Sequence, residues 1–254
     1  KQKKKIEIPI HTVQSDHIKH HQLTKHDQNP IINPNKDNWW ENEQVFNPGA
    51  IEIDGKVHLI YRSIGGDGVS RFGYANSIDG FTIDERISYP VYRHELTSHK
   101  GYYVNSSGGS WGGGEDPRLC KVEGDDNVYM TYTACDGGLR VGLTYIKASD
   151  LENKKWKWAR PKLISPPNQV NKNWVIFPEK INGKYVVILT ANTDRPPSKI
   201  SFAYFDRLED MWSESYWNEW YKTIDSHILS IPKRDSDHLE VGAAPIKTKY
   251  GWLL

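Results

Sequence analysis

A repeated proline–strand–turn–strand pattern is the feature that most constrains how this chain of 254 residues can fold. In each copy a proline leads into a short apolar segment. A tight turn of Gly, Asp or Asn follows, and a second segment rich in Val, Ile, Leu and Tyr completes a hairpin. The four copies lie at residues 47–62, 115–132, 177–189 and 242–254. Their turns are separated by 70, 58 and 68 residues, counted between Gly55, Asp125, Gly183 and Gly251.

Hairpins at this spacing predict the blades of a β-propeller, because a propeller repeats one small antiparallel sheet around an axis. Outer strands at residues 72–75 and 141–145 are expected to complete two blades, and a β-sandwich is the alternative all-β fold. The only helical signal, over residues 206–220, is crowded with aromatic residues and lacks a clean amphipathic stripe. The fourth copy stops in its second strand and a ring needs a last blade, so further sequence is expected after Leu254.

Composition limits the classes of binding partner and the cellular compartment that we expect for this protein. Residues 1–28 are polar and rich in histidine, which is typical of a loose arm, and residues 29–254 are expected to form one propeller domain. The net charge of +1 favours neither nucleic acid nor a membrane surface as a partner. The sequence contains no apolar run of about 18 residues and no signal peptide near Lys1. We therefore expect a cytoplasmic protein in which Cys120 and Cys135 are free thiols.

The strongest local signal is the glycine-rich segment 108–114, which leads directly into Glu115-Asp116-Pro117-Arg118. Glycines permit positive φ and close approach of a ligand to the backbone. At the start of an inner propeller strand, Asp116 would face the mouth of the axial channel. Neighbouring residues of a strand point to opposite faces, so Glu115 is not expected to reach the same substrate atom. The motif predicts a single acid, and a structural Asp116–Arg118 pair is the alternative.

Polar residues recur at the matching place in the other copies, which predicts a convergent polar pocket at one end of the ring. They are Asn47 before Pro48, Lys172 and Asn173 before Trp174, and His238 and Glu240 before Gly242. The guanidinium groups of Arg62 and Arg71 would suit phosphate oxygens or vicinal hydroxyls there. The sequence lacks the motifs for nucleotide binding, for a hydrolase nucleophile elbow and for zinc, so no metal and no cofactor are expected.

At these residues the sequence resembles glycoside hydrolase family 130, whose members are five-bladed propellers that act on β-mannosides. The resemblance covers roughly residues 29–254, and the chain would then be truncated in its fourth to fifth blade. The matching segments, in the family's order, are residues 45–51, 58–62, 114–118, 173–181, and 242–246 with 251–254.

The resemblance implies that Asp116 is the general acid and that Asn47, Arg62 and Asp116 surround the mannosyl unit being cleaved. In this family the acid protonates the glycosidic oxygen through a sugar hydroxyl while phosphate attacks the anomeric carbon from the opposite face, which gives α-mannose 1-phosphate. Phosphate needs no general base, so one acid and a cationic pocket suffice. The residues expected to contact the sugar are Asn47, Arg62, Glu115, Arg118 and Glu240. Those expected to bind the phosphate co-substrate are Arg62, Arg71, Lys172 and Asn173.

Two departures from the family pattern bear on the choice of nucleophile. Lys172-Asn173 stands where the phosphorylases usually carry Arg-Asn, and Lys keeps the charge but loses the planar fork of Arg. Residues 189–192 end the next strand where the phosphorylases tend to carry His-Arg, so Arg195 or Lys199 would have to replace that pair.

Two other functions stay open beside the phosphorylase. An inverting β-mannosidase would activate water with a second carboxylate, for which Glu240 is the first candidate and Glu179 the second. A sugar-binding propeller without catalysis is the third reading. The sequence leaves the linkage, the acceptor sugar and the oligomeric state undetermined. A homo-oligomer is compatible with it.

Overall fold

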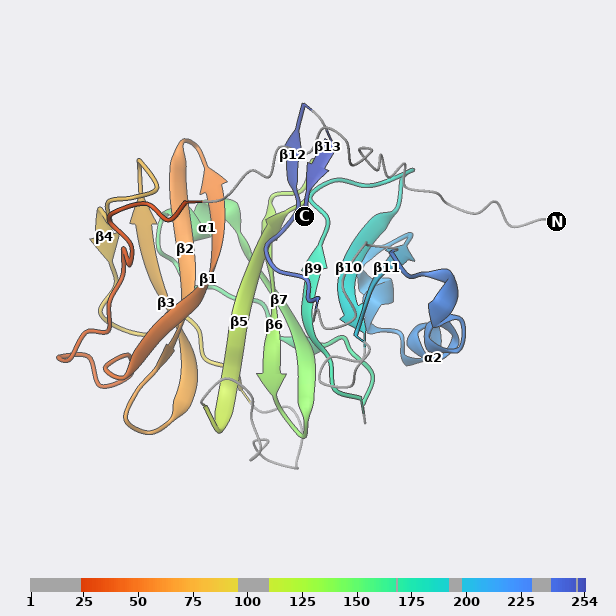
Figure 1. Cartoon of the computed structure of the whole chain (residues 1–254), viewed down its shortest axis with the longest axis horizontal. Helices are drawn as coiled ribbons and strands as arrows, with labels where there is room; N and C mark the ends of the chain where they lie inside the picture. The colour runs from red at the N-terminus through yellow and green to blue at the C-terminus, as the bar shows by residue number, and fades with distance from the viewer. Residues whose placement is uncertain (1–23, 96–109, 168, 192–197, 230–238, 250) are drawn as a thin grey trace.

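The computed structural model describes residues 24–95, 110–167, 169–191, 198–229, 239–249 and 251–254, and it is mostly β (Figure 1). Consecutive strands form antiparallel meanders, as the repeat predicted. The first meander contains β1 (Gln44–Ile53), β2 (Lys56–Ile64), β3 (Val69–Ser77) and β4 (Glu85–Arg86). The second contains β5 (Gly112–Lys121), β6 (Asn127–Cys135), β7 (Leu139–Lys147) and β8 (Lys162–Leu163). The third contains β9 (Lys172–Ile176), β10 (Tyr185–Ala191) and β11 (Lys199–Phe205), and β12 (Ile246–Thr248) and β13 (Gly251–Leu253) begin a fourth.

A short parallel pairing joins the first two meanders into one eight-stranded sheet. It involves two residue pairs at the start of β3 and β5, Val69 with Gly112 and Ser70 with Gly113. Every other ladder is antiparallel between strands adjacent in sequence. The expected outer strands at residues 72–75 and 141–145 are thus confirmed as β3 and β7.

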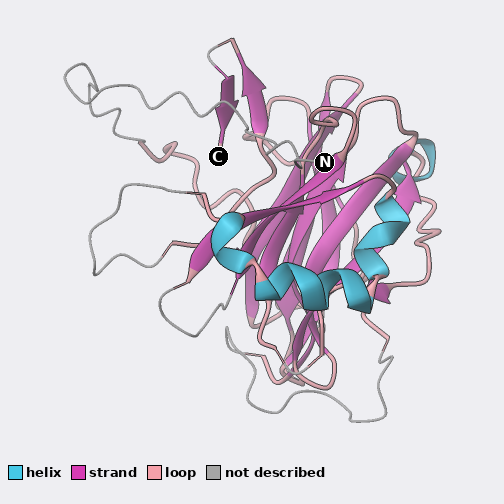
Figure 2. Cartoon of the chain, turned by 90° about the vertical axis from the view of Figure 1, so that its right-hand side faces the viewer, coloured by secondary structure: helices cyan, strands magenta, loops and turns pink. Residues whose placement is uncertain are grey.

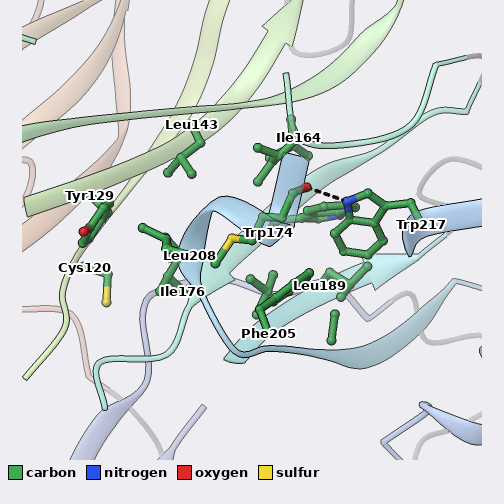
Figure 3. Close-up of a cluster of buried hydrophobic side chains, with 14 of the residues drawn as sticks. Cys120, Tyr129, Leu143, Ile164, Trp174, Ile176, Leu189, Phe205, Leu208 and Trp217 are labelled. Carbon is green, nitrogen blue, oxygen red and sulfur yellow. Dashed lines mark hydrogen bonds between the residues drawn. The ribbon is translucent and has the colours of Figure 1, made fainter. Parts of the chain in front are cut away.

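Consecutive meanders pack face to face, and each contact is a hydrophobic core. Phe72 and Tyr74 of β3 meet Met130 and Tyr132 of β6 between the first and second meanders. A second core lies between the second and third meanders (Figure 3), where buried side chains from β5 to β7 meet those of β9 to β11. A third core joins the third meander to the segment around Trp252. Burial on both faces explains why β2, β3 and β6 are almost wholly buried rather than alternating.

The third hairpin does not lie where the proline pattern placed it. Its first strand, β9, ends at Ile176, before Phe177-Pro178, and the segment after that proline forms only an isolated bridge between Ile181 and Lys184. The reason is that Pro48 and Pro117 lie inside β1 and β5, whereas Pro178 lies in the connection after β9. The prolines are therefore not equivalent in the three meanders.

Two short helices cover the third sheet on its outer side (Figure 2), in the region of the expected helical signal. They are η2 (Leu208–Trp212) and α2 (Glu214–Lys222), and the Ser213 hydroxyl caps α2 by accepting from the amide of Tyr216. Trp217 and Trp220 of α2 are buried, and the Trp217 indole donates to the carbonyl of Met211 at 2.7 Å. Two further short elements, α1 (Ala148–Glu152) and η3 (Ile224–Ser226), were not expected. Within the described ranges no helix is long and apolar enough to cross a membrane.

Only the end of the predicted N-terminal arm falls in the described part of the chain, since residues 1–23 lie outside it. His26 stacks on Phe81 with 4.1 Å between the ring centroids. Further on, the buried carboxylate of Glu41 accepts hydrogen bonds from Tyr61 and Arg86, which fastens this segment to the first meander. Cys120 and Cys135 are both free and buried, as expected.

The inner strands β1 and β5 approach each other closely at Gly49. A Cβ atom on Gly49 would lie 2.7 Å from the carbonyl oxygen of Pro117 and 3.1 Å from the side chain of Leu119. Backbone atoms cannot yield as a flexible side chain does, so this position requires glycine. The contact sets the distance between the two strands that carry Asn47 and Asp116.

Replacing Gly49 by Ala is expected to lower the free energy of unfolding by about 1–3 kcal/mol, the usual cost of overpacking a close contact. Urea denaturation followed by tryptophan fluorescence measures the change. Gly242→Ala is the matched control, because open space surrounds Gly242. Equal denaturation midpoints for the two variants would show that β1 and β5 are not held at this distance.

Candidate active site

The three inner strands share one backbone irregularity, and each places a polar side chain at it. Asn47 of β1, Asp116 of β5 and Asn173 of β9 have φ values of 44°, 50° and 61°. At each of them the strand register shifts, which marks a β-bulge. Asn and Asp tolerate this left-handed region better than other residues with a side chain, and a bulge re-aims the side chain it carries. The three residues are therefore structurally equivalent. Asn47 and Asp116 lie in the middle of β1 and β5, and Asn173 is the second residue of β9.

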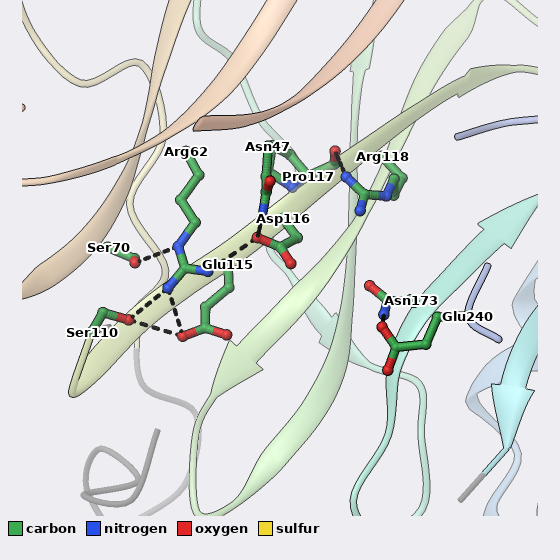
Figure 4. Close-up of polar contacts among 10 residues, drawn as sticks. All are labelled: Asn47, Arg62, Ser70, Ser110, Glu115, Asp116, Pro117, Arg118, Asn173 and Glu240. Atoms are coloured by element: carbon green, nitrogen blue, oxygen red, sulfur yellow. Dashed lines mark hydrogen bonds and ion pairs between the residues drawn. The ribbon is translucent and has the colours of Figure 1, made fainter. Parts of the chain in front are cut away.

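Asp116 is held by one of its two oxygens (Figure 4). Its Oδ1 accepts hydrogen bonds from Nδ2 of Asn47 at 2.8 Å and from a guanidinium nitrogen of Arg62 at 3.0 Å. Its Oδ2 has no hydrogen-bond partner among the residues that the structure describes. The side chain remains 18% exposed. A carboxylate fixed at one oxygen and open at the other is suited to exchanging a proton with a ligand.

The guanidinium group of Arg62 is the centre of the site. It is 1% exposed, and it donates to the carboxylate of Glu115 at 2.9 Å in addition to Asp116. The hydroxyls of Ser70 and Ser110 accept from it at 2.9 and 3.0 Å, and the ring of Phe46 covers it with 4.6 Å from the guanidinium carbon to the centroid. A buried cation is tolerated only when its donors are satisfied in this way. Arg62 thus ties β2, β3 and β5 together beneath Asp116.

Glu115 and Asp116 do not separate as strand alternation predicted. Because the bulge lies between Glu115 and Arg118, both carboxylates turn toward Arg62. Glu115 is 1% exposed and also accepts from the Ser110 hydroxyl at 2.8 Å. Together with burial, its charge raises the pKa of the neighbouring Cys135 thiol. Glu115 therefore lies beneath the pocket rather than in it, which differs from its expected contact with the sugar.

A second amide–carboxylate pair repeats this arrangement on the neighbouring strand. Nδ2 of Asn173 donates to Oε2 of Glu240 at 2.7 Å. The segment that carries Glu240 is fastened to the third sheet, since the amide of Val241 donates to the Thr190 hydroxyl at 2.8 Å. Asn47 and Asn173 thus each hold one carboxylate at the equivalent bulge.

Arg118 is drawn beside the two pairs in Figure 4, and it interacts electrostatically with the carboxylate of each. Burial lowers the pKa of its guanidinium, and the negative charges of Asp116 and Glu240 oppose this effect. Its Nε is buried without a hydrogen-bond partner in the described residues, and one of its terminal nitrogens donates a long hydrogen bond, 3.3 Å, to the carbonyl of Pro117. The predicted Asp116–Arg118 ion pair is not formed. Arg118 therefore brings an uncommitted cation to the pocket.

Other residues expected at the site lie elsewhere or are engaged otherwise. Arg71 lies on the face of β3 opposite to Ser70, where it pairs with Asp67 at 2.5 Å. Glu179 and Lys199 form exposed ion pairs with Lys247 and Asp225. Lys172 begins β9, next to Asn173. His238 and Arg195 fall outside the described residues.

Sequence reasoning missed three residues of the site, Phe46, Ser70 and Ser110. Serine and phenylalanine are common residues, so their types alone do not mark them, although Ser110 lies within the glycine-rich segment 108–114. Each is found only through Arg62, which brings together residues from three strands and the segment before β5.

Comparison with known proteins gives one family. The model of glycoside hydrolase family 130, described as β-1,4-mannooligosaccharide phosphorylase, matches residues 17–254. A 1,2-β-oligomannan phosphorylase of Thermoanaerobacter sp. (strain X514) is 33% identical over 89% of this chain and 68% of its own length. A β-1,2-mannobiose phosphorylase of the same organism is 31% identical over 91% of this chain and 70% of its own length. The chain thus spans about two thirds of the length of these relatives.

Solved structures agree on the fold. One is described with the family of mannoside phosphorylases that contains glycoside hydrolases targeting β-1,2 mannosidic linkages in Candida mannan. It matches with a TM-score of 0.59 and 21% identity over 90% of this chain and 67% of its own length. The structural neighbours are five-bladed β-propeller enzymes.

Glu115→Gln tests the support beneath Asp116. Removing the charge leaves the buried Arg62 without its closest counter-ion, so the free energy of unfolding is expected to fall by about 3 kcal/mol, the lower end of the range for breaking a buried ion pair. Urea denaturation measures the loss. The control is Glu219→Gln, which removes an exposed pair with Lys222 and is expected to change stability by less than about 1 kcal/mol. Equal stability of both variants would contradict the role given to Glu115.

Proposed function

The chain belongs to glycoside hydrolase family 130, the β-mannoside phosphorylase family, and on that premise we propose that it cleaves β-mannosides with inorganic phosphate, with Asp116 as the proton donor. Strands β1, β5 and β9 would then be the inner strands of three blades of a five-bladed propeller. The substrates would be a manno-oligosaccharide and phosphate, and the product would be α-mannose 1-phosphate.

The observation that carries this proposal is the environment of Asp116. Two donors fix Oδ1, while Oδ2 has no partner in the described residues and the side chain is open to solvent. Glu115 neutralises Arg62, so Asp116 faces an ion pair rather than a bare cation. As the proposed acid, Asp116 would donate a proton from Oδ2. That proton would pass to the glycosidic oxygen through a sugar hydroxyl as the bond to the anomeric carbon breaks.

Phosphate would bind on the side of Asn173. Arg118 has spare donors and no committed counter-ion, and Lys172 and Asn173 lie at the start of the neighbouring strand. Arg62 is committed to two carboxylates and Arg71 lies on the far face of β3, so Arg118 is the better phosphate ligand in this proposal. One phosphate oxygen would form the new bond to the anomeric carbon opposite to the leaving group, with inversion. Guanidinium and ammonium groups would stabilise the charge of phosphate during that attack.

One observation favours the inverting hydrolase as a second candidate. Asn173 donates to the carboxylate of Glu240, so a negative charge already stands where phosphate would bind. Phosphate at that place would be repelled. Glu240 would instead suit a general base that activates water, with Asp116 as the acid across the bond.

The first test is Asp116→Asn, which keeps the shape of the side chain but removes the acid. Turnover of β-1,2- and β-1,4-mannobiose is expected to fall by about 10²–10⁴-fold, the usual contribution of a general acid. Sugar products are measured by chromatography with and without phosphate. Asp206→Asn is the matched control, since Asp206 is an exposed carboxylate that pairs with Lys184. Unchanged turnover in Asp116→Asn would refute the assignment.

Glu240→Gln separates phosphorolysis from hydrolysis. If phosphate is the nucleophile, removing a repelling charge lowers the KM for phosphate, and mannose 1-phosphate remains the product. If water is the nucleophile, loss of the base lowers release of free mannose by about 10²-fold or more. Mannose and mannose 1-phosphate are quantified in parallel, with Glu179→Gln as the control from an exposed ion pair. Free mannose formed by the unmodified protein at the same rate with and without phosphate would contradict the phosphorylase.

A further inference from the structure

Two tryptophans stand out from the other eight by their exposure. All ten lie in described residues, and Trp39 and Trp111 are 61% and 47% exposed. The others are buried or half-buried in the hydrophobic cores and between the meanders. A large indole that is half exposed or more forgoes part of the stabilisation that full burial would give it. Core packing therefore does not account for the position of these two rings, and exposed apolar groups of this size often mark a binding site.

Trp111 is seated on the turn of residues 65–68 between β2 and β3. Its indole nitrogen donates to the carbonyl of Asp67 at 2.7 Å, and its backbone amide donates to the carbonyl of Gly68 at 3.1 Å. The ring lies flat enough on Gly68 that a Cβ atom there would be 2.6 Å from it. Gly68 also has a φ of +69°, so the turn needs glycine at this position for two reasons.

Trp39 also packs against this turn, through Gly65, and against Arg71 just after it. Its ring stacks on the guanidinium of Arg71, with 4.7 Å from the guanidinium carbon to the ring. Arg71 is itself buried and held by the carboxylate of Asp67. A side chain on Gly65 would collide with the backbone of Trp39. Asp67 thus fixes both indoles, one through its carbonyl and one through the cation it pairs with.

The turn adjoins the candidate active site. Arg62 precedes it on β2, and Ser70, whose hydroxyl accepts from Arg62, follows it on β3. Ser110, which contacts both Arg62 and Glu115, directly precedes Trp111. The turn and the start of β5 lie at the same end of the molecule, the lower end in Figure 1. From Trp111 to Asp116 the chain is five residues long, so at about 3.3 Å per residue the two lie within roughly 17 Å.

We propose that Trp39 and Trp111, mounted on the 65–68 turn, form an outer carbohydrate subsite that stacks the sugar units of a manno-oligosaccharide beyond those at the cleavage pocket. The proposal rests on the proposed function for the identity of the sugar. Its consequence is a preference for longer oligosaccharides, because the two rings would contact sugar units beyond the disaccharide held at Asp116.

The chemistry of the surface formed by Trp39, Trp111 and the 65–68 turn favours a sugar over a protein partner. The two rings are not part of one apolar patch, since the charged Asp67 and Arg71 lie between them. The core of a protein interface is depleted of charge and contiguous. A pyranose instead offers an apolar face to an indole and hydroxyls to the polar groups beside it. Both rings are also held by hydrogen bonds or stacking before any ligand arrives, which lowers the entropic cost of binding.

Binding of β-linked mannotetraose and mannobiose, measured by isothermal titration without phosphate, tests the subsite in the Asp116→Asn background. Trp39→Ala and Trp111→Ala are each expected to raise the Kd for mannotetraose about tenfold, a factor that corresponds to about 1.4 kcal/mol. The Kd for mannobiose is expected to change several-fold less. Phe81→Ala is the matched control, an exposed aromatic ring next to a different turn. Circular dichroism and size-exclusion chromatography monitor folding and association.

The outcomes separate the subsite from the proposed function. Unaltered mannotetraose binding in both tryptophan variants overturns the subsite alone, as does an equal loss for the two sugars. A change of oligomeric state in place of a change in sugar affinity assigns the rings to a protein interface and also overturns it. Failure of the parent protein to bind either sugar contradicts the proposed function together with the subsite. Replacement of each tryptophan by phenylalanine offers a conservative check, since Trp39→Phe and Trp111→Phe are expected to retain most of the selectivity for length.

Discussion

The buried guanidinium of Arg62 is the interaction on which the candidate site depends. Among the described residues it donates to acceptors on β3, on β5 and in the segment before β5, and an aromatic ring of β1 covers it. A cation so deeply buried would be very unfavourable without these partners. The same bonds that satisfy its charge fix the relative positions of the strands around Asp116. Stability and the geometry of the pocket therefore have one source.

The sequence alone was sufficient to predict the repeated hairpins, because a proline, a turn and alternating apolar residues are local signals. It placed the first, second and fourth hairpins correctly, and it found Asp116, Asn47 and Arg62, which the structure brings together. It misplaced the third hairpin because Pro178 lies after its strand rather than within it. It also separated Glu115 from Asp116, because period-2 reasoning assumes a regular strand and a bulge breaks that period. Arg71 was misjudged for a related reason, since its face of β3 is set by register across the sheet.

The candidate site has two carboxylate–amide pairs and a cation, Arg118, that interacts with both carboxylates, and this charge balance bears on the choice of nucleophile. Asp116 and Glu240 are each held by an asparagine from an inner strand, and Arg118 interacts electrostatically with both. An anionic nucleophile needs net positive charge at its binding place, whereas water needs a neighbouring base. The choice between phosphate and water therefore depends on the net charge around Arg118 and Asn173. It does not depend on the general acid.

The three bulges have a further consequence for how such a scaffold can change. Asn and Asp have nearly the same shape, and Asn47, Asp116 and Asn173 share one backbone conformation. Exchanging an amide for a carboxylate at any of the three requires no rearrangement of the main chain. At these three equivalent positions, side-chain identity decides where the acid lies, while the backbone conformation stays the same. Exchanging Asn and Asp between these strands would move the carboxylate to a new position in the site without a change of backbone.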